Sequence, residues 1–148
     1  MNRFEKSILS ITGGSHLSVH ALMLALPSLI PVIRNEFEVG LSTLGFVVSI
    51  SGFMFGLGAI PAGWAEKRFG GRQLLLIYQA GSSISALLVA LSGSFAMMVV
   101  GLSMMGFFCS IYHPAGLTLI SHRVKSLTRG MAIHGIFGSI GSAAGPLL

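Results

Sequence analysis

The chain has 148 residues, of which 53% are hydrophobic and only 9% charged. Its mean hydropathy is +0.84. Soluble domains carry about a quarter charged residues, so this composition excludes a water-soluble globule. The formal net charge is +5, but the basic residues form short clusters between long uncharged segments. Because they form no basic face on a soluble fold, the charge does not indicate nucleic-acid binding.

Four segments contain no Asp, Glu, Lys or Arg, and their lengths are 27, 27, 50 and 19 residues. A helix needs about 20 apolar residues to cross a bilayer, so the 50-residue segment has room for two spans and each of the others for one. Continuous apolar runs of this length are typical of helices and not of alternating barrel strands. We therefore predict an all-α integral membrane protein with five transmembrane helices, at about 8–33, 41–65, 73–92, 95–120 and 130–148.

The positions of the basic residues predict the orientation of these spans. Lys and Arg are retained in short loops on the cytoplasmic side of a membrane. Of the nine basic residues, only Arg34 falls on the opposite side of the predicted topology. The N-terminus is therefore predicted to be cytoplasmic, together with the other eight: Arg3, Lys6, Lys67, Arg68, Arg72, Arg123, Lys125 and Arg129.

The last apolar segment reaches Leu148 without a hydrophilic flank. Five membrane helices with an unfinished end would leave their packing faces uncovered. We therefore expect the 148 residues to be a fragment that is completed by missing C-terminal helices or by a partner.

Histidines are the only residues within the predicted spans that titrate near neutral pH, which makes them the candidates for chemistry. His16 and His20 are four residues apart and share one helix face. The fourth span runs in the opposite direction, which brings His113 to a depth similar to that of His16. Burying an ionisable group in a membrane is costly, so these residues predict a proton pathway. The alternative is that each is a neutral imidazole that hydrogen-bonds a neighbouring helix. We assign His122 and His134 to the membrane interface.

The sequence Tyr112-His113-Pro114 predicts a kink in the fourth span. Proline lacks a backbone N–H, so Pro114 removes the helical bond to the carbonyl of Ser110. Irregular backbone at membrane depth is tolerated where it lines a cavity or contacts protein. We therefore include Tyr112 with His113 in the candidate pathway.

A metal site and an enzyme active site are both poorly supported by the sequence. His16, His20 and His113 offer three ligands, and Cys109 lies one turn from His113, but no closed ligand-spacing motif is present. There is no paired carboxylate, no phosphate-binding loop and no Ser-His-acid arrangement. We therefore predict no resident metal, no cofactor and no enzymatic activity. The one cysteine also excludes an internal disulfide framework.

Two glycine pairs indicate close helix packing, because membrane helices associate where small residues allow their backbones to approach. The pairs are Gly52-x-x-x-Gly56 in the second span and Gly141-x-x-x-Gly145 in the fifth. A period of three helices would place these two glycine-rich spans in corresponding positions. Inverted repeats of three helices are typical of many secondary transporters.

The ten residues from Gly63 to Arg72, between the second and third spans, resemble the signature loop of the major facilitator superfamily, G-x-L-A-D-R-x-G-R-R. Gly63, Arg68, Gly70 and Arg72 match this pattern. Lys67 stands where the family has Asp, and Glu66 is one residue before it. The resemblance implies a cytoplasmic gating loop whose acid interacts with a helix end in the other half, for which a lysine is unsuited.

Further motifs are similar to particular branches of that superfamily. The sequence from Gly141 to Pro146 resembles the G-x-x-x-G-P motif of its antiporters. The tripeptides Ser15-His16-Leu17 and Tyr112-His113-Pro114 are similar to fosmidomycin-resistance-type efflux proteins. That branch has an Asp at the position that aligns with His20, so the resemblance implies that an imidazole replaces a coupling acid.

The resemblance implies a twelve-helix transporter in the bacterial inner membrane, with residues 1–148 as part of its N-terminal six-helix half. It predicts proton-coupled efflux of a small molecule by alternating access, with His20 and His113 titrating in the cavity. The expected partners are the small-molecule substrate, protons and the lipid bilayer. Two alternatives remain: a uniporter or symporter for a small metabolite on the same scaffold, and a small membrane subunit that does not itself transport.

Overall fold

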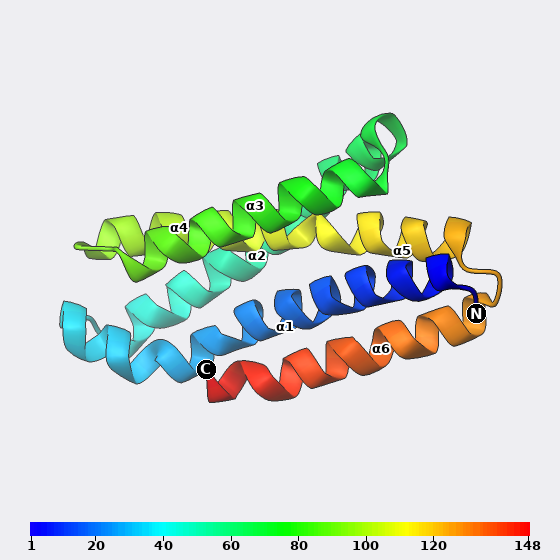
Figure 1. Ribbon diagram of the computed structural model, residues 1–148. Helices are drawn as coiled ribbons and strands as arrows, with labels where there is room; N and C mark the ends of the chain where they lie inside the picture. The colour runs from blue at the N-terminus through cyan, green and yellow to red at the C-terminus, as the bar shows by residue number, and fades with distance from the viewer.

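The computed structural model describes residues 1–148, and Figure 1 shows a bundle of helices that run side by side between two ends. All of the regular structure is helical, which confirms the all-α prediction. The elements are α1 (Arg3–Phe37), α2 (Leu41–Phe69), α3 (Gly71–Ala90), α4 (Phe95–Ser110), α5 (Tyr112–Arg123), α6 (Leu127–Ala144) and the 3-10 turn η1 (Gly145–Leu147).

Four helical units are long and apolar enough to cross a membrane, namely α1, α2, α3 and the joined pair α4 and α5. They correspond to the first four predicted spans. Helix α6 corresponds to the fifth, but its 18 residues are less apolar and it is not among the four. The fifth span therefore stays a prediction.

The fourth predicted span is divided at Ile111, as Pro114 predicts. The N–H of Ile111 donates to the carbonyl of Phe108 at 3.2 Å, which is a tighter turn than an α-helix makes. Pro114 cannot donate to the carbonyl of Ser110, so α4 ends there and α5 begins at Tyr112. By contrast, α1 remains helical through Pro27 and Pro31.

The stretch from Gly63 to Arg72 is not an extended loop, which corrects the prediction from the sequence. Helix α2 continues through Phe69, and Gly70 is the one residue between α2 and α3. Gly70 has φ of +78°, a conformation that favours glycine, and its N–H donates to the carbonyl of Glu66 at 2.8 Å. A charged stretch can remain helical once it has left the apolar part of the membrane, so the charges themselves did not end α2.

Parallel pairs of helices form the two sides of the bundle. Helices α1 and α6 run in the same direction with a constant register, so that Gly141 lies against Leu17 and Gly145 against Ala21 (Figure 1). A Cβ at Gly141 would overlap the backbone of Leu17, which explains the small residue there. Close contact at this predicted glycine pair is therefore observed.

Helices α2 and α4 also run parallel, but they do not meet through the predicted glycines. Gly106 lies against the backbone of Ser51, and the hydroxyl of Ser51 donates to the carbonyl of Leu102 at 3.1 Å. Gly52 and Gly56 have no other helix within 4 Å of a Cβ placed on them. Gly52 and Gly56 lie beside the face of α2 that contacts α4 through Ser51. A packing role for these two glycines therefore requires a segment other than residues 1–148.

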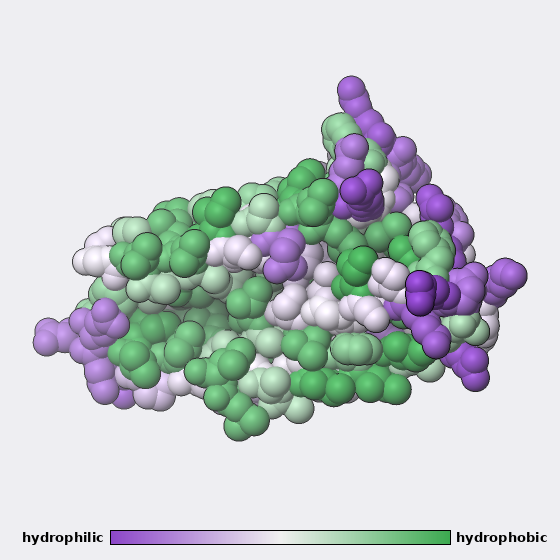
Figure 2. All heavy atoms as spheres, in the orientation of Figure 1, coloured by the Kyte–Doolittle hydropathy of each residue, from purple (hydrophilic) through white to green (hydrophobic).

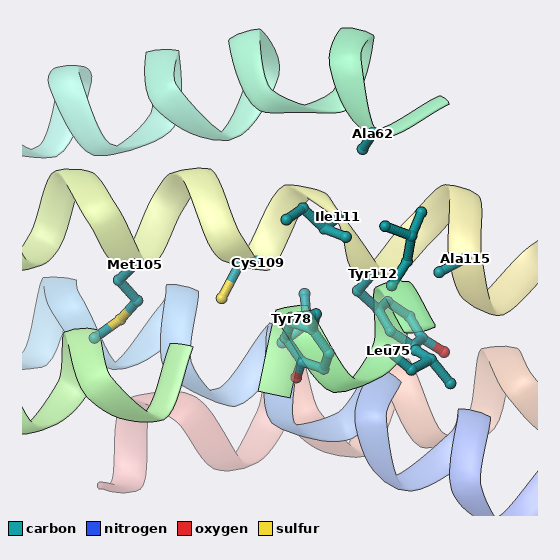
Figure 3. Close-up of a cluster of buried hydrophobic side chains, with 10 residues drawn as sticks. Ala62, Leu75, Tyr78, Met105, Cys109, Ile111, Tyr112 and Ala115 are labelled. Atoms are coloured by element: carbon teal, nitrogen blue, oxygen red, sulfur yellow. The ribbon is translucent and has the colours of Figure 1, made fainter. Parts of the chain in front are cut away.

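Three apolar clusters hold the helices together, of which the smallest consists of Leu9, Ile120 and Val124 and the other two are larger. The largest surrounds two tyrosines with no exposed surface, Tyr78 of α3 and Tyr112 of α5, and Figure 3 shows Met105, Cys109 and Ile111 beside them. The second largest lies nearer the opposite end: Leu26, Ile33, Leu44, Val47, Met98 and Leu102. The close packing around the tyrosines rigidifies the break between α4 and α5.

The face of the molecule in Figure 2 is mostly apolar in the middle of the bundle and hydrophilic at its two ends. Large side chains such as Phe46 and Phe53 are about two-thirds exposed, at 66% and 67%. A water-soluble protein does not maintain such a surface, whereas lipid accommodates it. The end that carries the N-terminus and eight of the nine basic residues is called the basic end below.

Candidate functional site

The three histidines predicted to meet do lie together near the middle of the bundle. The Nε2 atoms of His16 and His20, both on α1, are 3.0 Å apart. The ring of His113, on α5, has its centroid 5.3 Å from that of His16 and 5.9 Å from that of His20. The four-residue spacing on α1 and the antiparallel course of α5 produce this convergence.

A fourth histidine, His134 of α6, belongs to the same cluster, and its assignment to the membrane interface was wrong. It is 4% exposed, and its ring is stacked on that of His16 with centroids 3.8 Å apart and planes within 6°. The Nδ1 atom of His16 lies 2.8 Å from the backbone carbonyl of His134. The parallel pairing of α1 with α6 brings His134 inward, and a sequence does not specify this pairing helix by helix.

Tyr112 connects the cluster to the backbone of α1. Its hydroxyl hydrogen-bonds the carbonyl of Thr12 and lies 3.2 Å from Nδ1 of His134. The Tyr112 ring is also stacked near that of His16, with centroids 5.4 Å apart. Of the residues predicted for the proton pathway, His16, His20, Tyr112 and His113 are therefore all brought together, and His134 is added to them.

The hydrogen-bond partners determine which ring nitrogens carry protons. A carbonyl only accepts, so Nδ1 of His16 donates to His134 and, in a neutral ring, Nε2 of His16 must accept. The proton between the two Nε2 atoms therefore belongs to His20. Tyr112 donates its one hydrogen to Thr12 and so accepts from Nδ1 of His134.

One side of the cluster opens into a groove between α1 and α6. His16 and His20 line this groove together with small residues of α6: Gly135, Gly138, Ser139, Ser142 and Ala143. His20 is half-buried, whereas His16 is buried. A Cβ at Gly138 would overlap the His16 ring, so glycine is required for the ring to lie where it does. The network thus has an open side at His20 and a closed side at Tyr112.

Three ring nitrogens of His16, His20 and His113 lie within 4.8 Å of one another, a spacing compatible with ligands of one metal ion. The Nε2 atoms of His16 and His20 are also at hydrogen-bond distance from each other, 3.0 Å, so the same two nitrogens can share a proton instead of an ion.

Comparison with known proteins shows the family. Residues 11–148 match the family model described as Major Facilitator Superfamily. The chain belongs to the major facilitator superfamily. Together with the apolar helices, this membership establishes a multi-pass membrane protein of a transport family and not of an enzyme family.

Several curated relatives within the superfamily are named for efflux or resistance. The MFS-type transporter ppzB of Metarhizium majus is 30% identical over 84% of this chain and 29% of its own length. The tetracenomycin C resistance and export protein of Streptomyces glaucescens is 30% identical over 89% and 26%, respectively. The multidrug resistance protein B homolog of Mycobacterium tuberculosis is 26% identical over 82% and 24%. The chain therefore spans about a quarter of the length of these relatives.

The superfamily signature stretch lies at the basic end. Glu66 is half-buried in the last turns of α2, while Lys67, Arg68 and Arg72 are exposed around the turn at Gly70. The Arg68 guanidinium lies over the Phe69 ring, 5.7 Å from its centroid.

A buried carboxylate at the basic end was not singled out from the sequence. Glu5 is 5% exposed, and its two oxygens accept from the backbone N–H groups of Lys125 at 3.0 Å and Asn2 at 2.8 Å. The bond from Lys125, followed by that from Asn2, lowers the pKa of Glu5 below its usual value. Asn2-x-x-Glu5 is a capping box, and that local signal predicts the helix start but not the contact with the α5–α6 connection.

Proposed function

We propose that the protein is a secondary active transporter that exports a small molecule in exchange for protons by alternating access. The observation that carries this proposal is a cluster of four imidazoles, in which His16, His20 and His134 are connected by hydrogen bonds and His113 packs against His16 and His20. The cluster lies among helices whose membrane segments hold no Asp, Glu, Lys or Arg. Burying four titratable rings among membrane helices is costly, so a cluster of this kind indicates a functional site. The names of the efflux relatives support the direction of transport.

In this proposal, His20 and His113 bind and release the exchanged protons. His20 borders the groove between α1 and α6, where a substrate and water have access to it. His113 lies in the first turn of α5, and the break at Ile111 separates it from α4. Substrate and proton alternate at this site, as antiport requires.

The basic end serves as the cytoplasmic gate. The gate residues are in the last turns of α2, at Gly70 and in the first turn of α3, where they would contact the other half of the transporter: Gly63, Glu66, Lys67, Arg68, Gly70 and Arg72. A location in the bacterial inner membrane agrees with several bacterial relatives.

The driving force for transport tests this proposal. The full-length protein is reconstituted in proteoliposomes, and compounds beginning with tetracenomycin C are screened to find one that is transported. We expect substrate movement to follow an imposed pH gradient and to stop when nigericin collapses that gradient. Transport that is indifferent to nigericin and only equalises substrate concentration would instead show a uniporter.

A further inference from the structure

The hydrogen bonds of the cluster run in one direction, which makes its four imidazoles unequal. His20 donates to His16, and His16 donates to the carbonyl of His134. The His134 ring donates to Tyr112, and Tyr112 donates to the carbonyl of Thr12. Both series end at backbone carbonyls, which accept protons in hydrogen bonds but do not pass them on.

A proton that enters from the groove has a defined route along this network. It binds the lone pair at Nδ1 of His20, and the proton on Nε2 of His20 then crosses to Nε2 of His16, 3.0 Å away. His20 is left neutral with its proton on Nδ1, and His16 becomes an imidazolium with protons on both nitrogens. Reversal of the same two steps returns the proton to the groove.

The surroundings of His16 suit a positive charge. Its Nδ1–H bond to the carbonyl of His134 becomes charge-assisted once the ring is an imidazolium. The Tyr112 ring is stacked near the His16 ring with centroids 5.4 Å apart, within the range of cation–π attraction. The His134 ring is stacked on the His16 ring with centroids 3.8 Å apart. His20 has neither a carbonyl acceptor nor a stacked pair of rings.

We propose that the proton taken up at His20 is held on His16, and that His134 and Tyr112 are positioning residues that fix the tautomer and the place of the His16 ring. This inference rests on the proposed proton exchange and adds His16 to His20 and His113, as the ring on which the proton resides between uptake and release. Tyr112 acts through His134: it ties that ring to Thr12 of α1, and so holds the His134 carbonyl and ring against His16.

The groups around His16 that titrate come from each neighbouring helix. His20 lies on α1 itself, Tyr112 and His113 on α5, and His134 on α6. Behind Tyr112 lies Tyr78 of α3, with ring centroids 5.5 Å apart. Tyr78 hydrogen-bonds Ser18 and the carbonyl of Ser15 and no histidine, so it provides a matched control for Tyr112.

The test is nitrogen NMR of the full-length protein, with ¹⁵N-labelled histidine rings in lipid nanodiscs, which distinguishes Nδ1–H, Nε2–H and imidazolium forms. Signals are assigned with single His→Gln variants. We expect His16 to be the Nδ1–H tautomer at high pH, and to be the first of the four rings that carries both protons as the pH is lowered. An Nε2–H tautomer at high pH, or first protonation at His20 or His113, overturns the proposal.

Variants separate positioning from general stability. In Tyr112→Phe, we expect His16 to be a mixture of tautomers at high pH and no longer to be the first ring that is protonated. Tyr78→Phe also removes a buried hydroxyl, and it should leave both properties of His16 unchanged. His134→Asn keeps an N–H donor near the position of Nδ1 and should rescue the pattern that His134→Leu loses. Equal spectra for the two tyrosine variants would refute the positioning role.

The outcome is also distinguishable from failure of the proposed function. If transport does not depend on the pH gradient but the His16 spectra are as expected, the proposed proton-coupled transport is wrong and the tautomer assignment of His16 still holds. Proton-driven transport combined with a different first-protonated ring removes only the present inference.

Discussion

His16, His20 and His134 each have their own hydrogen-bond partners, and His113 packs against the first two rings. These neighbours could be anticipated only in part from the sequence. The spacing of His16 and His20 places them on one helix face, and the alternation of span directions places His113 near them. His134 was not anticipated, because its neighbours depend on α6 running parallel to α1 in one register. The sequence around His134 contains no separate signal for that register except the glycines that follow it.

At the residue scale, Glu5 predicts a pH dependence of stability. Because its folded pKa lies below the ordinary value of 4.5, it stabilises the fold above that pH, and the contribution is lost as the pH falls through the folded pKa. We expect Glu5→Gln to unfold at a lower temperature than the parent protein at pH 7, and the difference to close as the pH falls through the lowered pKa of Glu5.

The matched control for this prediction is Glu36→Gln, which alters an exposed carboxylate at the other end of α1. Its unfolding midpoint should remain close to that of the parent over the same pH range. Circular dichroism in detergent measures the unfolding midpoints. If the midpoints of the two variants depend on pH in the same way, the bonds from Lys125 and Asn2 to Glu5 do not contribute to stability.

At the scale of the helices, most boundaries follow from simple chemistry, and the exceptions have physical causes. Uncharged lengths locate α1, α2, α3 and the α4–α5 unit, and Pro114 predicts the break at Ile111. The persistence of α2 to Phe69 was not predicted, since a charged stretch was interpreted as a loop. Charged side chains in a last helical turn reach water without breaking the backbone, so Gly70 and not the charges ends α2.

The contact between α1 and α6 predicts a strong position effect along α6. A valine at Gly138 would overlap the His16 ring, whereas Gly135, on the same helix, has open space. Overpacking typically costs about 1–3 kcal/mol, so Gly138→Val should lower the thermal unfolding midpoint well below that of Gly135→Val. Similar midpoints for these two variants would contradict the observed register of α6.

The contact between α2 and α4 predicts a similar difference. Gly106→Val would place side-chain atoms in the backbone of Ser51, while Gly52→Val would meet no helix of these residues. We expect the first substitution to reduce the folded yield and unfolding temperature and the second to leave both nearly unchanged. If Gly52→Val is the more damaging change in the full-length protein, a segment outside these residues packs on that face.

At the scale of the whole molecule, the distribution of charge predicts the orientation in the membrane. The basic end carries the N-terminus, the turn at Gly70 and Lys125, and Arg34 is the one basic residue at the other end. Positively charged loops remain in the cytoplasm, so the basic end should face inward. The apolar middle of the surface in Figure 2 should then lie in the bilayer, between the basic end and the end that carries Arg34.

Cysteine labelling measures this orientation. In a Cys109→Ser background, a membrane-impermeant maleimide should label Glu38→Cys in intact cells and Ser126→Cys only after the cells are opened. Both positions are exposed, so access to the reagent depends on the side of the membrane. The opposite pattern would invert the topology and with it the assignment of the cytoplasmic gate.

The measurement that tests the central claim most directly is proton-driven transport by the full-length protein with His20→Ala and His113→Ala combined. His122→Ala, which removes an exposed histidine near the end of α5, is the control. The account predicts that the double variant loses pH-gradient-driven transport in proteoliposomes and that the control retains it. Unchanged transport by the double variant would contradict the role of the histidine cluster in proton exchange.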